Sequence, residues 1–210
     1  MKYSVIDIKN WDRKDLFKFY TEDTKISLNL TVDIDVSPLV KFVKQKGLKF
    51  YPTIMWIVCK VINSHKEFRY AWGENGELIN WDYISPAYVD FHPEDEKFTK
   101  LTTEYVDDLF EFHKNFMTVK EKYSNNRGFG LEMPKNFFDV SCLPWSYYKS
   151  FDLTVYDEGK WLTPIVVWGK YEKRDDKLLM PLTLKIHHSV ADGFHLCRFF
   201  NEVQQLINKL

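Results

Sequence analysis

The stretch Lys185-Ile186-His187-His188-Ser189-Val190-Ala191-Asp192-Gly193-Phe194-His195 joins an apolar run to a segment with helical spacing. The run from Leu182 to Ile186 is typical of a buried strand, and Gly193 opens the predicted final helix. Two adjacent histidines stand at this corner. Histidine is the side chain that exchanges a proton near neutral pH without help. The pattern therefore favours a general base at one of the two histidines over a purely structural role.

Asp192 follows the second histidine by four positions and has two possible roles. Its carboxylate could orient His188, or it could hold the corner through a salt bridge, and the sequence leaves both open. The chain has no GxSxG elbow, so a serine-hydrolase role for the histidine is weak. A metal site at His187, His188, Asp192 and His195 is a minor alternative. Adjacent histidines on a strand point to opposite faces and seldom bind one ion.

Outward from this corner, the hydrophobic pattern predicts alternating strands and helices. Alternation over 26–34 predicts a half-buried strand, and Gly73-Glu74-Asn75-Gly76 predicts a hairpin between 68–72 and 78–81. Further strands are predicted at 5–6, 87–91, 97–101, 137–142, 153–156, 164–171 and 178–188. Helices are predicted from Asp12, from Ser37 to Gly47, from Pro52, over 103–123 and over 193–210. We expect one α/β (α+β type) domain over residues 1–210, a two-layer sandwich of a mixed sheet with helices mainly on one face.

Arg13 is an unusual residue for its predicted position. It follows Asp12, the predicted N-cap, and so falls in the first turn of a helix with Leu16, Phe17 and Tyr20 on its apolar side. A cation in the first turn is disfavoured by the helix dipole. We therefore expect a carboxylate partner for Arg13 elsewhere in the chain.

Composition excludes some classes of function. The chain has 29 Lys plus Arg against 30 Asp plus Glu and no basic stripe, so we expect no nucleic-acid partner. The 17 Phe, 12 Tyr and 7 Trp fit an aromatic core, or a site or interface for an aromatic ligand. Cys59, Cys142 and Cys197 are isolated in apolar settings, which predicts buried free thiols. No apolar run could span a bilayer, so we expect a cytoplasmic protein without a membrane partner.

The segment from His187 to His195 resembles the HHxxxDGFH signature of the chloramphenicol acetyltransferase family. A bare HxxxD is shared by many CoA-dependent acyltransferases, but further segments match in order and at the family's length. They are Asn10-Trp11-Asp12-Arg13-Lys14, Lys49-Phe50-Tyr51-Pro52, Ser141-Cys142-Leu143-Pro144-Trp145, Pro164-Ile165 and Gly169-Lys170-Tyr171. The resemblance covers essentially the whole chain and implies the CoA-dependent acyltransferase fold.

The resemblance also implies a reaction. The histidine that matches His188 takes the proton from the 3-hydroxyl of chloramphenicol, which attacks acetyl-CoA directly without an acyl-enzyme. The serine that matches Ser141 hydrogen-bonds the oxyanion, and the aspartate that matches Asp192 pairs with the arginine that matches Arg13. Acetyl-CoA is then a co-substrate, with no permanently bound cofactor and no metal. The product is an inactivated antibiotic, which gives resistance.

Binding residues are implied in the same way. Lys49 and Lys170 match lysines near the CoA 3′-phosphate, while Tyr51 and Tyr171 match positions around its adenine. The acceptor pocket of the family matches Tyr20, Leu28, Phe98 and Phe138. The family is a homotrimer whose active sites lie between subunits, so the resemblance implies this assembly too.

Departures from the family pattern leave two alternatives. Val89 and Val167 stand where threonines are expected, Asp90 stands where the family is usually apolar, and Lys25-Ile26 lacks the usual cysteine. These changes favour a related acyl-CoA O-acyltransferase with a different alcohol acceptor. A non-catalytic trimeric protein that binds aromatic compounds is a further alternative, against which the intact set of His188, Ser141, Asp192 and Arg13 counts.

Overall fold

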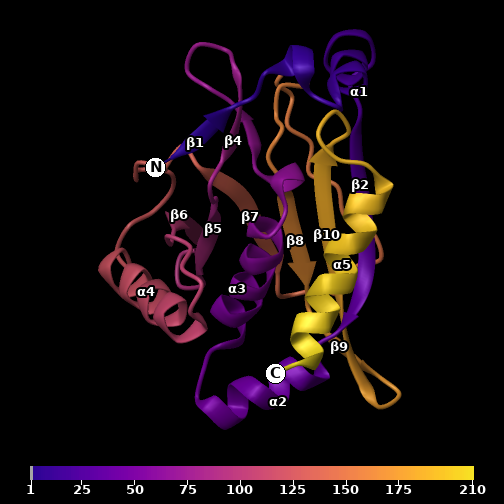
Figure 1. Cartoon of the computed structure of the whole chain (residues 1–210). Coiled ribbons are helices and arrows are strands. Elements are labelled where there is room, and N and C mark those ends of the chain that lie inside the picture. Colours follow the sequence, from indigo (N-terminus) through magenta and orange to yellow (C-terminus); the bar gives the residue numbers. More distant parts are fainter. Residues whose placement is uncertain (1) are drawn as a thin grey trace.

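The computed structural model describes residues 2–210 and is organised around one large mixed sheet (Figure 1). Its strand order is β2-β10-β8-β7-β5-β6, and β9 pairs with the first part of β10. β7 runs parallel to both of its neighbours, whereas the other pairings are antiparallel. The strands are β2 (Ser27–Asp35), β5 (Ser85–His92), β6 (Lys97–Thr102), β7 (Phe137–Leu143), β8 (Ile165–Gly169), β9 (Glu172–Arg174) and β10 (Lys177–His187). The predicted mixed sheet is confirmed.

Helices cover one face of this sheet, as the pattern predicts. The helices are α1 (Lys14–Lys18), α2 (Ser37–Lys46), α3 (Phe50–Asn63), α4 (Leu109–Lys122) and α5 (Gly193–Asn208). α3 and α5 lie side by side across the front of the sheet in Figure 1 and contact each other. Gly47 ends α2 in the left-handed conformation that favours glycine (φ +67°), as predicted. No helix within residues 2–210 is long and apolar enough to cross a membrane.

A second, smaller sheet has the order β1-β4-β3. It consists of β1 (Tyr3–Val5), β3 (Tyr70–Trp72) and β4 (Leu78–Trp81). The hairpin predicted between 68–72 and 78–81 is confirmed, and Gly76 in its turn has a φ of +80°. Along the chain, this hairpin lies between α3 of the helical layer and β5 of the large sheet.

The two faces of the large sheet differ, and this difference positions the site. On the face covered by helices, the ring of Trp168 on β8 packs 5.5 Å from that of Tyr51 on α3. Side chains alternate along a strand, so the neighbour of Trp168, Val167, points to the opposite side. We call that opposite side the open face. The loop over residues 144–163 crosses part of it, and Tyr148 there contacts the hydroxyl of Thr183 on β10 at 3.0 Å.

Several predicted boundaries are wrong. α4 begins at Leu109 and not at 103, because the side chain of Asp108 caps it by accepting from the backbone N–H of Glu111 (2.8 Å). α3 begins at Phe50, two residues before the predicted Pro52. The segment 153–156 forms no strand. Arg13, and not Asp12, occupies the N-cap position of α1, without a side-chain cap. Cys59 is buried and Cys142 half-buried as thiols, but Cys197 is exposed on α5.

Candidate active site

His188 begins the loop between β10 and α5, which we call the His188 loop (residues 188–192). Its backbone N–H donates to the carbonyl of Ile26 (2.8 Å), and its ring stacks on Tyr20 with centroids 4.1 Å apart. Nδ1 lies 3.0 Å from the carbonyl oxygen of Ala191. Because a carbonyl only accepts, Nδ1 carries the hydrogen, and Nε2 keeps its lone pair. The geometry therefore provides a fixed imidazole with one nitrogen ready to take a proton.

Arg13 holds the His188 loop through three contacts. Its Nε donates to the carbonyl of Ser189 (2.7 Å), and Nη2 donates to the carbonyl of His188 (2.9 Å). Nη1 lies 3.2 Å from Oδ2 of Asp192. The carboxylate therefore turns toward Arg13 and does not orient His188, which decides between the two roles left open by the sequence. Burial alone would raise the pKa of Asp192, but Arg13 and His195 outweigh it and hold that pKa below its usual value.

The two adjacent histidines occupy different environments. His187 is buried, and its Nδ1 lies 2.7 Å from the hydroxyl of Ser189. Burial is the main cause that lowers the pKa of His187, which favours the neutral ring. His188 is only half-buried and faces Tyr20. Within residues 2–210, no three His, Cys, Asp or Glu side chains are arranged to hold a metal ion.

Ser141 lies on the open face of β7 and far from His188 in the same chain. The register pairs Ser141 with Val167, and Val167 with Thr183 on β10. His188 lies five positions beyond Thr183. This places it about 17 Å along the strands and about 10 Å across them from Ser141. One chain therefore does not bring these two predicted site residues together.

The four predicted CoA-binding residues gather at the end of β8. Tyr171 packs its ring 5.5 Å from Phe50, which brings the segment after β8 against the start of α3. Lys49 and Lys170 in these two segments are exposed. The ring of Tyr51 packs against Trp168, and burial raises the pKa of its hydroxyl. These residues lie on the side of Ser141 that is away from His188.

The predicted acceptor residues do not all face the site. Tyr20 contacts His188, and Phe98 is exposed at the edge strand β6. Phe138 is fully buried and alternates with Ser141 along β7, so it faces the helices. Leu28 pairs with Ile186 and packs against the core on the helical side. Full burial corrects the acceptor role expected for Phe138, whereas the role of the partly buried Leu28 stays a prediction.

One ion pair on the open face was missed by the sequence analysis. Lys100 on β6 pairs with Asp139 on β7 across β5, and their side chains are only 14% and 22% exposed. Asp139 lies two positions before Ser141, so both side chains share a face. The strand predicted at 137–142 already implies, by the same alternation, that Asp139 lies on the face of Ser141. Asp90, by contrast, pairs with Lys120 of α4 on the helical side.

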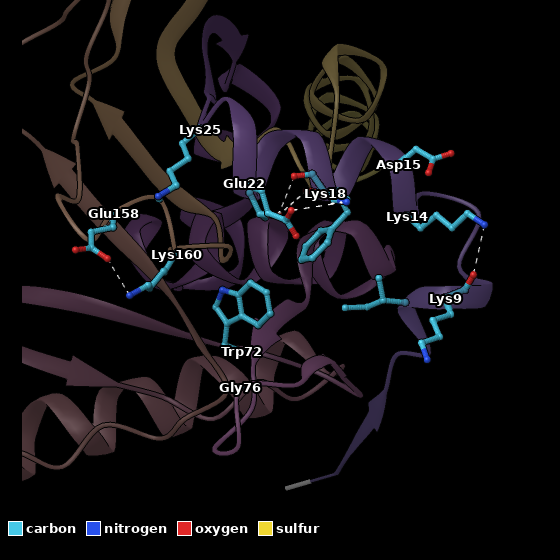
Figure 2. Close-up of a pocket in the computed structure, with 14 residues that line it drawn as sticks. Lys9, Lys14, Asp15, Lys18, Glu22, Lys25, Trp72, Gly76, Glu158 and Lys160 are labelled. Atoms are coloured by element: carbon cyan, nitrogen blue, oxygen red, sulfur yellow. Dashed lines mark hydrogen bonds and ion pairs between the residues drawn. The ribbon is translucent and has the colours of Figure 1, made fainter.

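A cavity of about 760 Å³ is lined by other residues, several of them in the segment 14–22 that follows Arg13. Figure 2 shows Lys18 and Glu22 on one wall, Glu158 and Lys160 on another, and Trp72 from β3 between them. None of the predicted site residues lines it. The size of a cavity is therefore a poor guide to the chemistry in the isolated chain.

Comparisons with known proteins show relatives along nearly the whole chain. Chloramphenicol acetyltransferases of Clostridium perfringens and Escherichia coli (type 3) are 38% and 36% identical to the chain. These matches cover 98% and 99% of this chain and 95% and 98% of the relatives. A solved chloramphenicol acetyltransferase superposes with a TM-score of 0.87 at 23% identity, over 98% of this chain and 100% of the other.

A more distant likeness identifies the fold. The dihydrolipoamide acetyltransferase of Azotobacter vinelandii superposes with a TM-score of 0.69 at 18% identity, over 87% of this chain and 81% of the other. The fold is that of the CoA-dependent acyltransferases. The sequence profile of "Chloramphenicol acetyltransferase" matches residues 1–204. The chain is thus an acyltransferase and belongs to the chloramphenicol acetyltransferase family.

Proposed function

We propose that the protein transfers the acetyl group of acetyl-CoA to the 3-hydroxyl of chloramphenicol and thereby gives antibiotic resistance. The observation that carries this proposal is the hydrogen bond from Nδ1 of His188 to the carbonyl of Ala191 (3.0 Å). In the neutral ring it leaves the lone pair on Nε2, as a general base requires. The named relatives supply the substrate, since each carries chloramphenicol acetyltransferase as its name.

The proposed reaction is a direct transfer within a ternary complex. Nε2 of His188 takes the proton of the acceptor hydroxyl while that oxygen attacks the thioester carbonyl. The hydroxyl of Ser141 donates a hydrogen bond to the resulting oxyanion. When the tetrahedral intermediate collapses, the carbon–sulfur bond breaks, and the CoA thiolate takes the proton from His188. Acetyl-CoA is consumed as a co-substrate, and the scheme uses no permanently bound cofactor or metal.

The site is proposed to lie between subunits of a homotrimer. Ser141 and His188 of one chain are separated by about 17 Å along the strands and about 10 Å across them, which is too far for both to act on one carbonyl carbon. A neighbouring copy that brings its His188 to the open face near Ser141 would complete the site. The side chain of Tyr20 would then enter with His188, because the two rings are stacked.

The remaining assignments rest on the resemblance to the family. Lys49 and Lys170 would bind the 3′-phosphate of CoA as compact charges, with Tyr51 and Tyr171 near the adenine. Phe98 and Tyr20 would contact the acceptor. Residues 1–210 would act as one domain in the cytoplasm, where acetyl-CoA is made and where free thiols such as those of its cysteines stay reduced.

A second candidate is acyl transfer to a different alcohol. The specific observation is the partly buried pair of Lys100 and Asp139 on the open face, two positions from Ser141. Removing charges from water is costly unless they are well satisfied, so such a pair favours an acceptor with polar groups. Val89 and Val167 in place of the expected threonines remove two hydroxyls and so change the lining of the acceptor site as well.

One assay separates the candidates. The purified protein is mixed with acetyl-CoA, and free thiol is measured with and without chloramphenicol. Release stimulated by chloramphenicol, with a monoacetylated product by mass spectrometry, supports the first proposal. Release that requires another alcohol supports the second candidate. No release with any acceptor would contradict both and leave a binding protein.

A further inference from the structure

A line of polar side chains continues from Asp192 away from His188. Oδ1 of Asp192 lies 2.8 Å from Nδ1 of His195, while Oδ2 of the same carboxylate faces Arg13. Nε2 of His195 lies 3.6 Å from Oε1 of Glu67. Oε2 of Glu67 lies 3.1 Å from Nη2 of Arg198. The ring of His195 therefore lies between two carboxylates, one of which belongs to the His188 loop.

Glu67 is a rigid end point for this connection. It lies in the one-turn helix Lys66–Phe68, and Phe68 is fully buried against Phe199 of α5, with ring centroids 6.0 Å apart. The side chain of Glu67 is 18% exposed. Burial alone would raise the pKa of Glu67, but its backbone hydrogen bond, His195 and Arg198 hold that pKa below its usual value. The carboxylate is therefore ionised at neutral pH and fixed to the core.

His195 also caps α5. The backbone N–H of Asp192 donates to Nδ1 of His195 (3.1 Å), as the third helical residue does in a capping box. This contact holds the main chain of the loop end. Because Nδ1 accepts here, the hydrogen of the neutral ring is on Nε2, which faces Glu67 at 3.6 Å, so Glu67 holds the ring that holds Asp192. Both act on the segment that presents the carbonyl of Ala191 to His188.

We propose that His195 is a positioning residue, through which Glu67 fixes Asp192 and keeps the His188 loop in its base-competent geometry. The proposal rests on His188 being the general base of the proposed function. Arg13 holds the loop from one side, and Glu67 with His195 holds it from the other. Without His195, only Arg13 holds the loop whose carbonyl at Ala191 fixes the tautomer of His188.

The test compares four variants. His195→Ala removes both contacts, and His195→Gln keeps an acceptor for the N–H of Asp192. Glu67→Gln removes the negative charge at the far end. His65→Ala is the matched control, because His65 is 17% exposed and forms a 2.7 Å contact with Glu202 of the same helix α5, away from the loop. Thermal unfolding, kcat and KM for chloramphenicol are measured for each.

We expect His195→Ala to lower kcat about tenfold or more with KM within about twofold, since small misplacement of a base is costly. Glu67→Gln should lower kcat in the same direction, and His195→Gln should recover much of it. His65→Ala should lower the melting temperature and leave kcat within about twofold of wild type. A wild-type kcat in His195→Ala, or an equal loss of kcat in His65→Ala, would overturn the proposal.

A second readout needs no acceptor. Nitrogen-15 NMR of the histidine rings reports which nitrogen of His188 carries the hydrogen, with the His188→Ala spectrum as the assignment. We expect the Nδ1–H form in wild type and His65→Ala, and a mixture of forms in His195→Ala. An unchanged His188 signal in His195→Ala would overturn the proposal. If the wild type fails to acetylate chloramphenicol, the proposed function is wrong, and this spectrum still decides the role of His195.

Discussion

Arg13 and Asp192 lie 179 positions apart in the sequence, yet their side chains form one contact of 3.2 Å beside His188. Arg13 also binds the carbonyls of His188 and Ser189, so a single guanidinium satisfies three groups of the loop. This use of the rigid fork explains why a cation stands at the start of α1, where the helix dipole disfavours it. The contact links the first helix to the last.

Replacement of Arg13 should affect both stability and turnover. Arg13→Ala leaves two loop carbonyls and the carboxylate of Asp192 without their donor, and we expect a loss of about 2–3 kcal/mol in the free energy of unfolding. The melting temperature should fall by about 4–12 °C, and kcat should fall as well. Differential scanning calorimetry and steady-state kinetics measure these effects. Arg13→Lys should recover only part of the loss. An unchanged melting profile in Arg13→Ala would contradict the account.

The charge of Asp192 should make the free energy of unfolding fall as the pH is lowered. Its pKa is held below the unfolded value of about 3.9, so its contribution is present above that pH and is lost as the pH falls through the folded pKa. We expect Asp192→Asn to be less stable than wild type at pH 7, with a difference that shrinks below about pH 4. Urea unfolding between pH 3 and 7 measures it. A difference that is constant over this range would mean that the charge of Asp192 contributes nothing.

Ser141 should contribute to the transition state rather than to binding. Its hydroxyl is proposed to meet the oxyanion, and loss of one such donor elsewhere costs about 100- to 1000-fold in kcat. We expect Ser141→Ala to lose activity on that scale with little change in either KM. A change confined to KM would move Ser141 from the reacting centre to a substrate contact.

The pair of Lys100 and Asp139 should influence the choice of acceptor. We expect the double variant Lys100→Met/Asp139→Leu to raise kcat/KM for chloramphenicol several-fold, because an aromatic acceptor no longer has to cover two charges. The KM for acetyl-CoA should stay within about twofold. Lys120→Met/Asp90→Leu removes a comparable pair on the helical side and is the control. The same change of acceptor preference in both double variants would count against a site role for Lys100 and Asp139.

The hydrophobic pattern predicts the sheet and most helices, but tertiary contacts decide several boundaries. Residues 103–108 stay outside α4 because other parts of the fold bind their backbone. The hydroxyl of Ser85 accepts from the N–H of Tyr105 (3.0 Å), and the indole of Trp56 donates to the carbonyl of Val106 (3.2 Å). A helix over these residues would lose both contacts. Local spacing contains no information about these partners.

The candidate site was predictable to different degrees. One short motif predicts His188 as the base but leaves two roles open for Asp192, and the position of Arg13 in a predicted helix predicts its need for a carboxylate. The resemblance named Phe138 as an acceptor contact, but alternation along β7 turns it into the core. The distance between Ser141 and His188 depends on the order of β7, β8 and β10, which the sequence does not state. The resemblance therefore implies a site between chains, and the separation of Ser141 and His188 in the fold supports it, whereas local spacing alone does not.

His188 of one chain is proposed to act with Ser141 of another, and an experiment that mixes inactive subunits examines this pairing. His188→Ala and Ser141→Ala are each expected to be nearly inactive when assembled alone. If they are unfolded together and refolded as a 1:1 mixture, about a quarter of the sites in a random trimer combine an intact His188 with an intact Ser141. The account predicts recovery of about a quarter of wild-type chloramphenicol acetylation. A mixed assembly, verified by mass spectrometry, that stays as inactive as its parents would contradict it.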